Sequence, residues 1–130
     1  MGAEHSVELA SYECILGEQG GAVLINTLSS GSQSCLIAGT VPAADEERHL
    51  NTMLDRGETD RLIIVYGKNC VDKTPYRKNE QLTKLGFSKV AVYPGGMLEW
   101  SLLQDAYGCQ AFSTTSTCAD VLAFAPNVAL

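Results

Sequence analysis

The sequence predicts an α/β protein whose central sheet is mainly parallel and carries helices on both faces. Two segments, Leu62 to Tyr66 and Val90 to Tyr93, are continuous apolar runs rich in β-branched residues, which is typical of strands buried on both faces. Between them, Thr74 and Pro75 are suited to the start of a helix that runs towards Leu85. Strands that alternate with helices in this way build a parallel sheet.

The remaining elements follow in chain order. Ser11 is a suitable N-cap for a short helix over the segment YECILGE, which stops at Gly20–Gly21. Residues 23–26 are expected to form the first core strand. A second helix is expected over residues 44–56, where one face is apolar, acidic residues fill the first turn and a glycine follows the end. A last helix, strongly apolar, follows Gly95–Gly96.

The chain of 130 residues is long enough for one domain, because a chain of this size buries about two thirds of its unfolded surface on folding. We expect a leader at residues 1–10, the folded domain at 11–108 and a C-terminal extension at 109–130. In the extension, a stretch rich in serine and threonine precedes CADVLAFA. This favours a short docked helix capped near Ser116, with a mobile tail as the alternative. Trp100 is expected to be a packing anchor.

Composition excludes several classes of partner. The net charge is −6 and the pI is near 4.7, and no basic stripe extends beyond the central loop and its helix, so we do not expect nucleic-acid binding. Five cysteines show no CxxC spacing and only two histidines accompany them, so no metal site is expected, and no cofactor either. The odd number of cysteines and the lack of a signal peptide indicate free thiols in the cytoplasm.

The N-terminus reads MGAEHS, which fits the myristoylation pattern at Gly2 with Ser6. No basic cluster follows to provide the second membrane signal that stable anchoring requires. No run of residues reaches transmembrane length either. Membrane association is therefore expected only if Gly2 is lipidated, and a plain leader is the favoured interpretation.

The loop from Gly67 to Lys73 is the candidate site. It lies between the carboxyl end of a strand and the start of a helix, where backbone N–H groups converge and the helix dipole favours an anion. Residues 67–78 include four basic residues and one acidic residue, although the whole chain is acidic. These features predict an anion-binding loop, and they favour the thiolate form of Cys70. The alternative is an ordinary loop thiol beside a solvated helix face.

The same stretch resembles the rhodanese-like family of sulfurtransferases and related proteins. A strand ending in Tyr66, the loop, a helix running into LGF, the strand at 90–93, and GG followed by Trp100 occur in the family's order. Upstream, the segment CLIAGTVP resembles the family's Gly-His-Ile-Pro-Gly-Ala segment. The resemblance covers roughly residues 11–107. It implies a rhodanese-like fold, with the site in the crevice outside the carboxyl ends of the strands.

The chain departs from the family at its polar positions. In the family's enzymes the catalytic cysteine is the first residue of the loop, and Gly67 stands there in this sequence. Asn26 and Thr27 stand where the family has an acidic residue and a nearby arginine, and Leu36 replaces a histidine. The loop is slightly longer than in the sulfurtransferases and nearer the length of the phosphatase branch, where Lys73 replaces the signature arginine.

Three functions follow from these observations. The favoured one is a degenerate module that has lost catalysis and serves as a binding or scaffolding domain, with the loop as an anion pocket or an apolar surface for a protein partner. The alternative is a sulfurtransferase in which Cys70 carries a persulfide, and a Cys-type phosphatase or arsenate reductase comes third. The expected ligand is thiosulfate, sulfate or phosphate. Its predicted binding residues are Gly67, Lys68, Asn69, Val71, Asp72, Lys73 and Thr74.

Two of these residues have alternative roles. Asn69 is expected to hydrogen-bond its own loop backbone in an Asx-type turn, with a ligand oxygen as the alternative partner. Gly67 is either a nucleophile lost by drift or a residue kept small so that a ligand or the backbone approaches closely.

Overall fold

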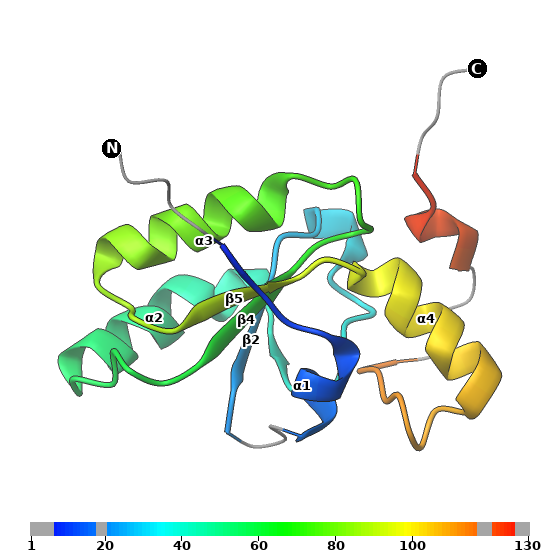
Figure 1. Cartoon of the computed structure of the whole chain (residues 1–130), viewed down its shortest axis with the longest axis horizontal. Helices are drawn as coiled ribbons and strands as arrows, with labels where there is room; N and C mark the ends of the chain where they lie inside the picture. Colours follow the sequence, from blue (N-terminus) through cyan, green and yellow to red (C-terminus); the bar gives the residue numbers. More distant parts are fainter. Residues whose placement is uncertain (1–6, 18–20, 117–120, 127–130) are drawn as a thin grey trace.

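The computed structural model describes residues 7–17, 21–116 and 121–126 (Figure 1). Gly2, which carries the myristoylation pattern, and Gly20, the expected stop of the first helix, lie outside these ranges. The elements in chain order, with η for a 3-10 helix, are β1 (Glu8–Leu9), α1 (Tyr12–Gly17), β2 (Val23–Asn26), η1 (Ser30–Ser32), β3 (Thr40–Val41), η2 (Ala43–Asp45), α2 (Glu46–Asp55), β4 (Ile63–Tyr66), α3 (Thr74–Leu85), β5 (Val90–Tyr93), α4 (Gly96–Tyr107) and η3 (Val121–Phe124). All the strands and α-helices predicted between residues 11 and 108 are present.

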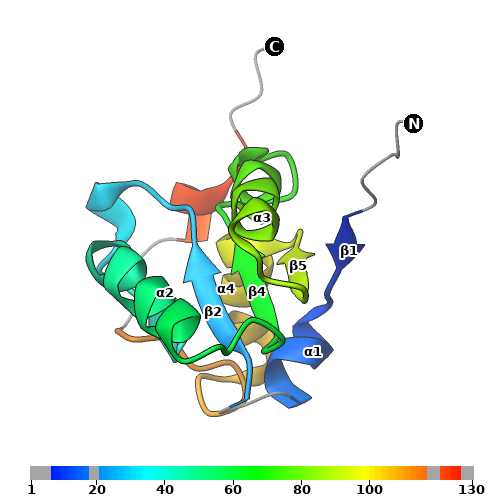
Figure 2. The same ribbon diagram turned by 90° about the vertical axis from the view of Figure 1, so that its left-hand side faces the viewer.

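The strands form one sheet in the order β1-β5-β4-β2-β3, and every neighbouring pair is parallel. Leu24 on β2 lies opposite Ile64 on β4, which lies opposite Ala91 on β5. Helices α2 and α3 cover one face of the sheet, and α1 and α4 cover the other (Figure 2). The structure therefore confirms the predicted α/β class with a parallel central sheet and helices on both faces.

Each face of the sheet has its own apolar core, because successive residues of a strand point to opposite faces. The core towards α1 and α4 includes Ile15, Leu24, Ile64, Ala91, Met97 and Trp100. The core towards α2 and α3 contains Val23, Ile25, Leu50, Met53, Ile63, Val65, Leu82 and Phe87. Because both faces are covered, β2 and β4 are buried along their whole length, which is why their sequences show no polar alternation.

The C-terminal extension completes the core next to α4. Phe112 and Phe124 are buried, and the ring of Phe112 lies 5.1 Å from that of Trp100 and nearly perpendicular to it. Trp100 is 2% exposed and donates its indole N–H to the Ser113 carbonyl at 3.0 Å. The predicted role of Trp100 as a packing anchor is confirmed, and the short helix η3 contacts α4.

Two features of the chain differ from the sequence expectations. Strand β1 pairs with β5 although it lies in the segment predicted as a leader. Helix α2 begins at Glu46, two residues later than expected, because Ala43–Asp45 forms a 3-10 turn before it. Within the described ranges, no helix combines the length and the apolar character needed to cross a membrane.

Tyr66 links the end of β4 to the segment before β3. Its buried hydroxyl accepts the Ile37 N–H at 3.1 Å and shares a hydrogen bond of 2.8 Å with the Thr40 hydroxyl. Burial raises the pKa of the Tyr66 phenol to about 12, and its two hydrogen bonds oppose that rise. The phenol is therefore a neutral, buried polar link between two segments that are far apart in the sequence.

We expect Tyr66→Phe to lower the free energy of unfolding by about 1–3 kcal/mol, because it leaves the buried Ile37 N–H without an acceptor. Tyr107→Phe is the matched control, since Tyr107 is 71% exposed and should contribute less than about 0.5 kcal/mol. Urea unfolding followed by Trp100 fluorescence measures both values. Equal losses in the two variants would show that the Tyr66 hydroxyl is not a structural link.

Candidate functional site

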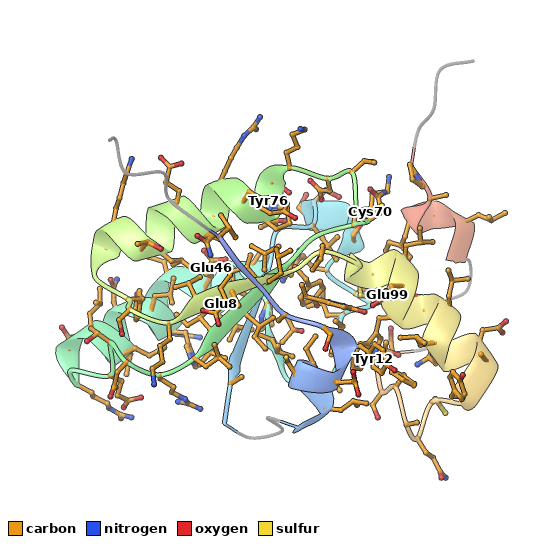
Figure 3. All side chains as sticks on the ribbon, in the orientation of Figure 1. Glu8, Tyr12, Glu46, Cys70, Tyr76 and Glu99 are labelled. Atoms are coloured by element: carbon orange, nitrogen blue, oxygen red, sulfur yellow. The ribbon has the colours of Figure 1, made fainter. Side chains whose placement is uncertain are left out.

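The loop 67–73 connects β4 to α3 at the carboxyl edge of the parallel sheet, as the sequence predicts. Figure 3 shows Cys70 on this loop, on the side of the start of α4 and the C-terminal segment η3. Three segments therefore surround the loop, namely the first turn of α3, the turn between β5 and α4, and η3. Each of them makes hydrogen bonds to it.

The carboxylate of Asp72 holds the loop together from within. Its Oδ2 accepts the Lys68 N–H at 2.9 Å, and its Oδ1 accepts the Thr74 N–H at 2.9 Å and the Thr74 hydroxyl at 2.7 Å. Partial burial by itself raises the pKa of this carboxyl, but these hydrogen bonds and the charge of Lys68 outweigh it and hold the pKa below 3.8. Backbone donors at both ends of the loop thus bind an anion that belongs to the protein.

Gly67 has no space for a side chain. A Cβ atom at this position would meet Oδ2 of Asp72, and it would lie 2.8 Å from Cγ of Pro75 and 2.9 Å from Oγ1 of Thr27. These distances are shorter than van der Waals contact. The first residue of the loop is therefore a glycine because the Asp72 carboxylate and its neighbours fill the volume next to it.

The turn before α4 docks directly on the loop backbone. The N–H groups of Met97 and Leu98 donate to the carbonyls of Gly67 and Lys68 at 3.0 and 2.9 Å. Gly96 has a φ of +62°, and a Cβ there would lie 2.5 Å from the Gly67 carbonyl oxygen. The second glycine of the pair is thus required by a close approach of two backbones, and the first amides of α4 are already occupied.

Tyr93 and Glu99 fix the other side of this turn. The Tyr93 hydroxyl donates to Oε1 of Glu99 at 2.6 Å, and a Cβ at Gly95 would come within 2.6 Å of the same carboxylate. Burial raises the pKa of the Tyr93 phenol, and its bond to the Glu99 carboxylate raises it further. The pair is a structural contact at the start of α4.

Asn69 connects the loop to the C-terminal segment. Its Oδ1 accepts the Val71 N–H at 3.1 Å, which confirms the predicted Asx-type turn. Its Nδ2 donates to the Phe124 carbonyl at 2.8 Å, and the side chain is buried. The sequence carries no signal for this second bond, because the two residues lie 55 positions apart.

Cys70 lies at an exposed position of the loop. It is exposed and free, and among the described residues no group hydrogen-bonds to its thiol. Its neighbour Val71 is 60% exposed. Among the predicted backbone donors, the N–H groups of Lys68 and Thr74 serve Asp72 and that of Val71 serves Asn69, so these three are not directed at the Cys70 thiol.

The positive charges near the loop are partly compensated by carboxylates of the protein itself. Lys78 forms an ion pair of 2.7 Å with Glu46 on α2. Lys68 lowers the pKa of the Asp72 carboxyl. Lys73 and Arg77 are exposed on the first turn of α3 and just before it.

At three positions where the rhodanese-like family has charged or polar residues, this chain has Asn26, Thr27 and Leu36, which make structural contacts. Asn26 exchanges two hydrogen bonds with Gln33, at 3.1 and 2.7 Å, and Leu36 is buried. The hydroxyls of Thr27 and Thr74 lie 2.7 Å apart. Thr74 was expected to cap α3, but it is the first helical residue and its side chain bonds to Asp72 and Thr27 instead.

The cysteines differ from the expectation that all of them are free. Cys35 is disulfide-bonded, whereas Cys14, Cys70 and Cys109 are free. The argument from free thiols to a cytoplasmic location therefore loses its support.

Across the described residues, no three His, Cys, Asp or Glu side chains are grouped to hold a metal ion.

We expect Asp72→Asn to lower the free energy of unfolding near neutral pH by about 1 kcal/mol, a value reduced by the partial exposure of the group. A carboxamide offers one acceptor oxygen where the carboxylate offers two. Because the folded pKa lies below 3.8, the difference should persist down to that pH and vanish as the pH falls through the folded pKa.

Urea unfolding of the wild type and Asp72→Asn over a series of pH values tests this expectation. Asp55→Asn, a substitution of an exposed carboxylate on α2, is the matched control and should have little effect. A difference between wild type and Asp72→Asn that does not change on acidification would contradict the role given to the carboxylate.

No protein-family model matches the chain, and no curated protein matches it significantly. Solved structures do match. The Alr3790 protein from Anabaena sp. has a TM-score of 0.57 at 19% identity, covering 72% of this chain and 86% of its own. The BH2092 protein from Bacillus halodurans has a TM-score of 0.59 at 15% identity. The match covers 73% of this chain and 72% of the BH2092 chain. A third match is a Rhodanese_3-like domain of the same Anabaena protein, with a TM-score of 0.49 and 23% identity. The match covers 62% of this chain and 91% of that domain.

At these identities the likeness concerns the fold. The chain therefore has the α/β fold with a parallel central sheet that its sequence predicts, and it shares this fold with the Alr3790 and BH2092 proteins.

Proposed function

We propose that this chain is a rhodanese-like binding module that does not transfer sulfur. One observation carries the proposal: the volume that a nucleophile's side chain would need at position 67 is filled by the Asp72 carboxylate and its neighbours. In the family's enzymes, as the sequence resemblance implies, the nucleophile stands at this position. Position 67 is therefore suited to a glycine, and the Asp72 carboxylate occupies the place where a nucleophile's side chain would begin.

The sulfurtransferase alternative places a persulfide on Cys70. A persulfide carrier needs fixed donors around its terminal sulfur, so that the anion is stabilised and can be attacked. Here the amides of Lys68 and Thr74 serve Asp72, and Cys70 is exposed beside Val71. The same use of the amides argues against a phosphatase, whose loop must leave its N–H groups for the phosphate.

The binding function is better served by a protein partner than by a small anion. Thiosulfate, sulfate or phosphate would have to displace the Asp72 carboxylate to reach the amides it occupies. In contrast, Val71 is 60% exposed and Leu122 is 74% exposed, on two segments that the bond from Asn69 to Phe124 holds together. Exposed apolar side chains beside a fixed loop suit a partner surface.

We expect no transfer of sulfur from thiosulfate to cyanide by the wild type, because the Cys70 thiol is exposed and the amides of Lys68 and Thr74 bind Asp72. After thiosulfate treatment, the mass of the intact protein should show no added sulfur, and neither should the mass of the peptide that contains Cys70. Cys70→Ser and Cys109→Ser are the variants to compare, since both residues are exposed free cysteines. Turnover that is lost in Cys70→Ser and kept in Cys109→Ser would establish the sulfurtransferase instead.

Reinstating the family's cysteine should not restore activity. We expect Gly67→Cys to lower the free energy of unfolding by about 1–3 kcal/mol, because the added side chain displaces Asp72 and overpacks the loop. Gly31→Cys is the matched control, since a Cβ at Gly31 meets no atom within 4 Å and should be nearly neutral. Urea unfolding and the sulfur-transfer assay on both variants measure this, and an active, undestabilised Gly67→Cys would contradict the proposal.

A further inference from the structure

Two neighbouring hollows lie on the protein away from the loop 67–73. The first has a volume of about 500 Å³ and the second about 550 Å³, within the range of small-molecule sites. Val41, His49 and Arg61 line both of them, so the two meet at these residues. The first borders the amino end of β2, both reach Arg61 just before β4, and no residue of the loop lines either.

The first hollow is apolar over most of its wall. Its wall includes Ile15, Ala22, Val23, Leu24, Ile37 and Trp100. Beside them, Ala38 and Gly39 contribute little side-chain bulk where the chain leads into β3. A ligand group placed here would lie against aliphatic side chains and the buried indole of Trp100, which favours a hydrocarbon or aromatic body.

The second hollow carries the basic residues. Arg48 is paired with Asp45 at 2.7 Å, and Arg61 makes a longer contact of 3.5 Å with Glu58. Nε of Arg61 donates to the Gly21 carbonyl at 3.0 Å, which fixes the guanidinium at the border of both hollows. Arg56 also lines the second hollow and has no ion-pair partner among the described residues. Three arginines and two carboxylates leave one uncompensated positive charge.

His49 adds an unsatisfied polar atom at the junction. Its Nε2 is buried and has no hydrogen-bond partner in the described parts of the chain. Buried polar groups are nearly always paired, so such an atom beside a hollow marks a place where the protein alone leaves a hydrogen bond unmade. An oxygen of a bound ligand, or a water held with it, would provide the partner.

We propose that these two hollows form one binding site for a small amphipathic monocarboxylate, with its apolar body in the first and its carboxylate against Arg56 and Arg61 in the second. A guanidinium fork matches the geometry of a carboxylate, and the single uncompensated charge suits an anion with one charge. The site is separate from the loop, so the test of this site does not depend on whether the protein transfers sulfur.

Hydrocinnamate is a suitable probe, because it combines a phenyl ring and a short chain with one carboxylate, and hydrocinnamyl alcohol is its neutral counterpart. Titration of isotope-labelled protein, followed by N–H resonances, locates the binding. The indole N–H of Trp100 and the Nε–H of Arg61 report on the two hollows, and the amides of Cys70 and Lys73 report on the loop. We expect saturable shifts of the first pair with the acid, no comparable shift of the second pair, and binding of the alcohol weaker by about tenfold or more.

Arg56→Gln is the principal variant, because this residue makes no ion pair among the described residues and its loss should spare the fold. We expect it to weaken hydrocinnamate binding by about tenfold. Arg61→Gln should do the same, with urea unfolding as its check because Arg61 also holds the Gly21 carbonyl. Arg77→Gln, an exposed arginine on α3, is the matched control and should bind as the wild type does.

Three results would overturn the proposal. One is the absence of a saturable shift at Trp100 and Arg61. Another is equal binding of the acid and the alcohol, which would leave the arginines without a role. The last is equal weakening by Arg56→Gln and Arg77→Gln, which would indicate attraction by overall charge rather than a site.

Discussion

A carboxylate bound by backbone amides is the contact on which the candidate site depends. Asp72 joins the first turn of the loop, through Lys68, to the first turn of α3, through Thr74. The side chain of Thr74 extends this link to Thr27 at the end of β2. Strand ends, loop and helix start are therefore held in one arrangement by a charge that the chain carries itself.

This arrangement explains why the loop keeps the form of an anion site. A strand, a turn with converging N–H groups and a helix start produce a favourable environment for negative charge in many α/β proteins. Here that environment is retained and an internal carboxylate uses it. The glycines follow from the same packing, since Gly67 adjoins the carboxylate and Gly96 adjoins the Gly67 carbonyl.

The fold was predictable where a local pattern determines it. The strands at 63–66 and 90–93 are buried on both faces, and a continuous apolar run is the direct result. β1 and β3 have two residues each, too few for any pattern, and β1 depends wholly on its pairing with β5. The sequence therefore indicates the centre of the sheet better than its edges.

The candidate site was predictable only in part, for a related reason. The Asx turn of Asn69 involves a residue two positions away, and the sequence predicts it. The position of the loop follows from the order of the elements. The bond from the Lys68 N–H to Asp72 depends on how the loop closes, and the bond from Asn69 to Phe124 depends on where the C-terminal segment packs. No local sequence pattern predicts either bond, and none predicts the disulfide of Cys35.

The short edge strands limit how another chain can be recognised. A peptide that adds itself to a sheet as an extra strand requires several consecutive free backbone groups along an edge. Among the described residues, β1 and β3 each present only two residues there, and the longer strands are in the interior of the sheet. Strand addition at these two edges is therefore disfavoured, and a surface of side chains is the better place for another chain to bind.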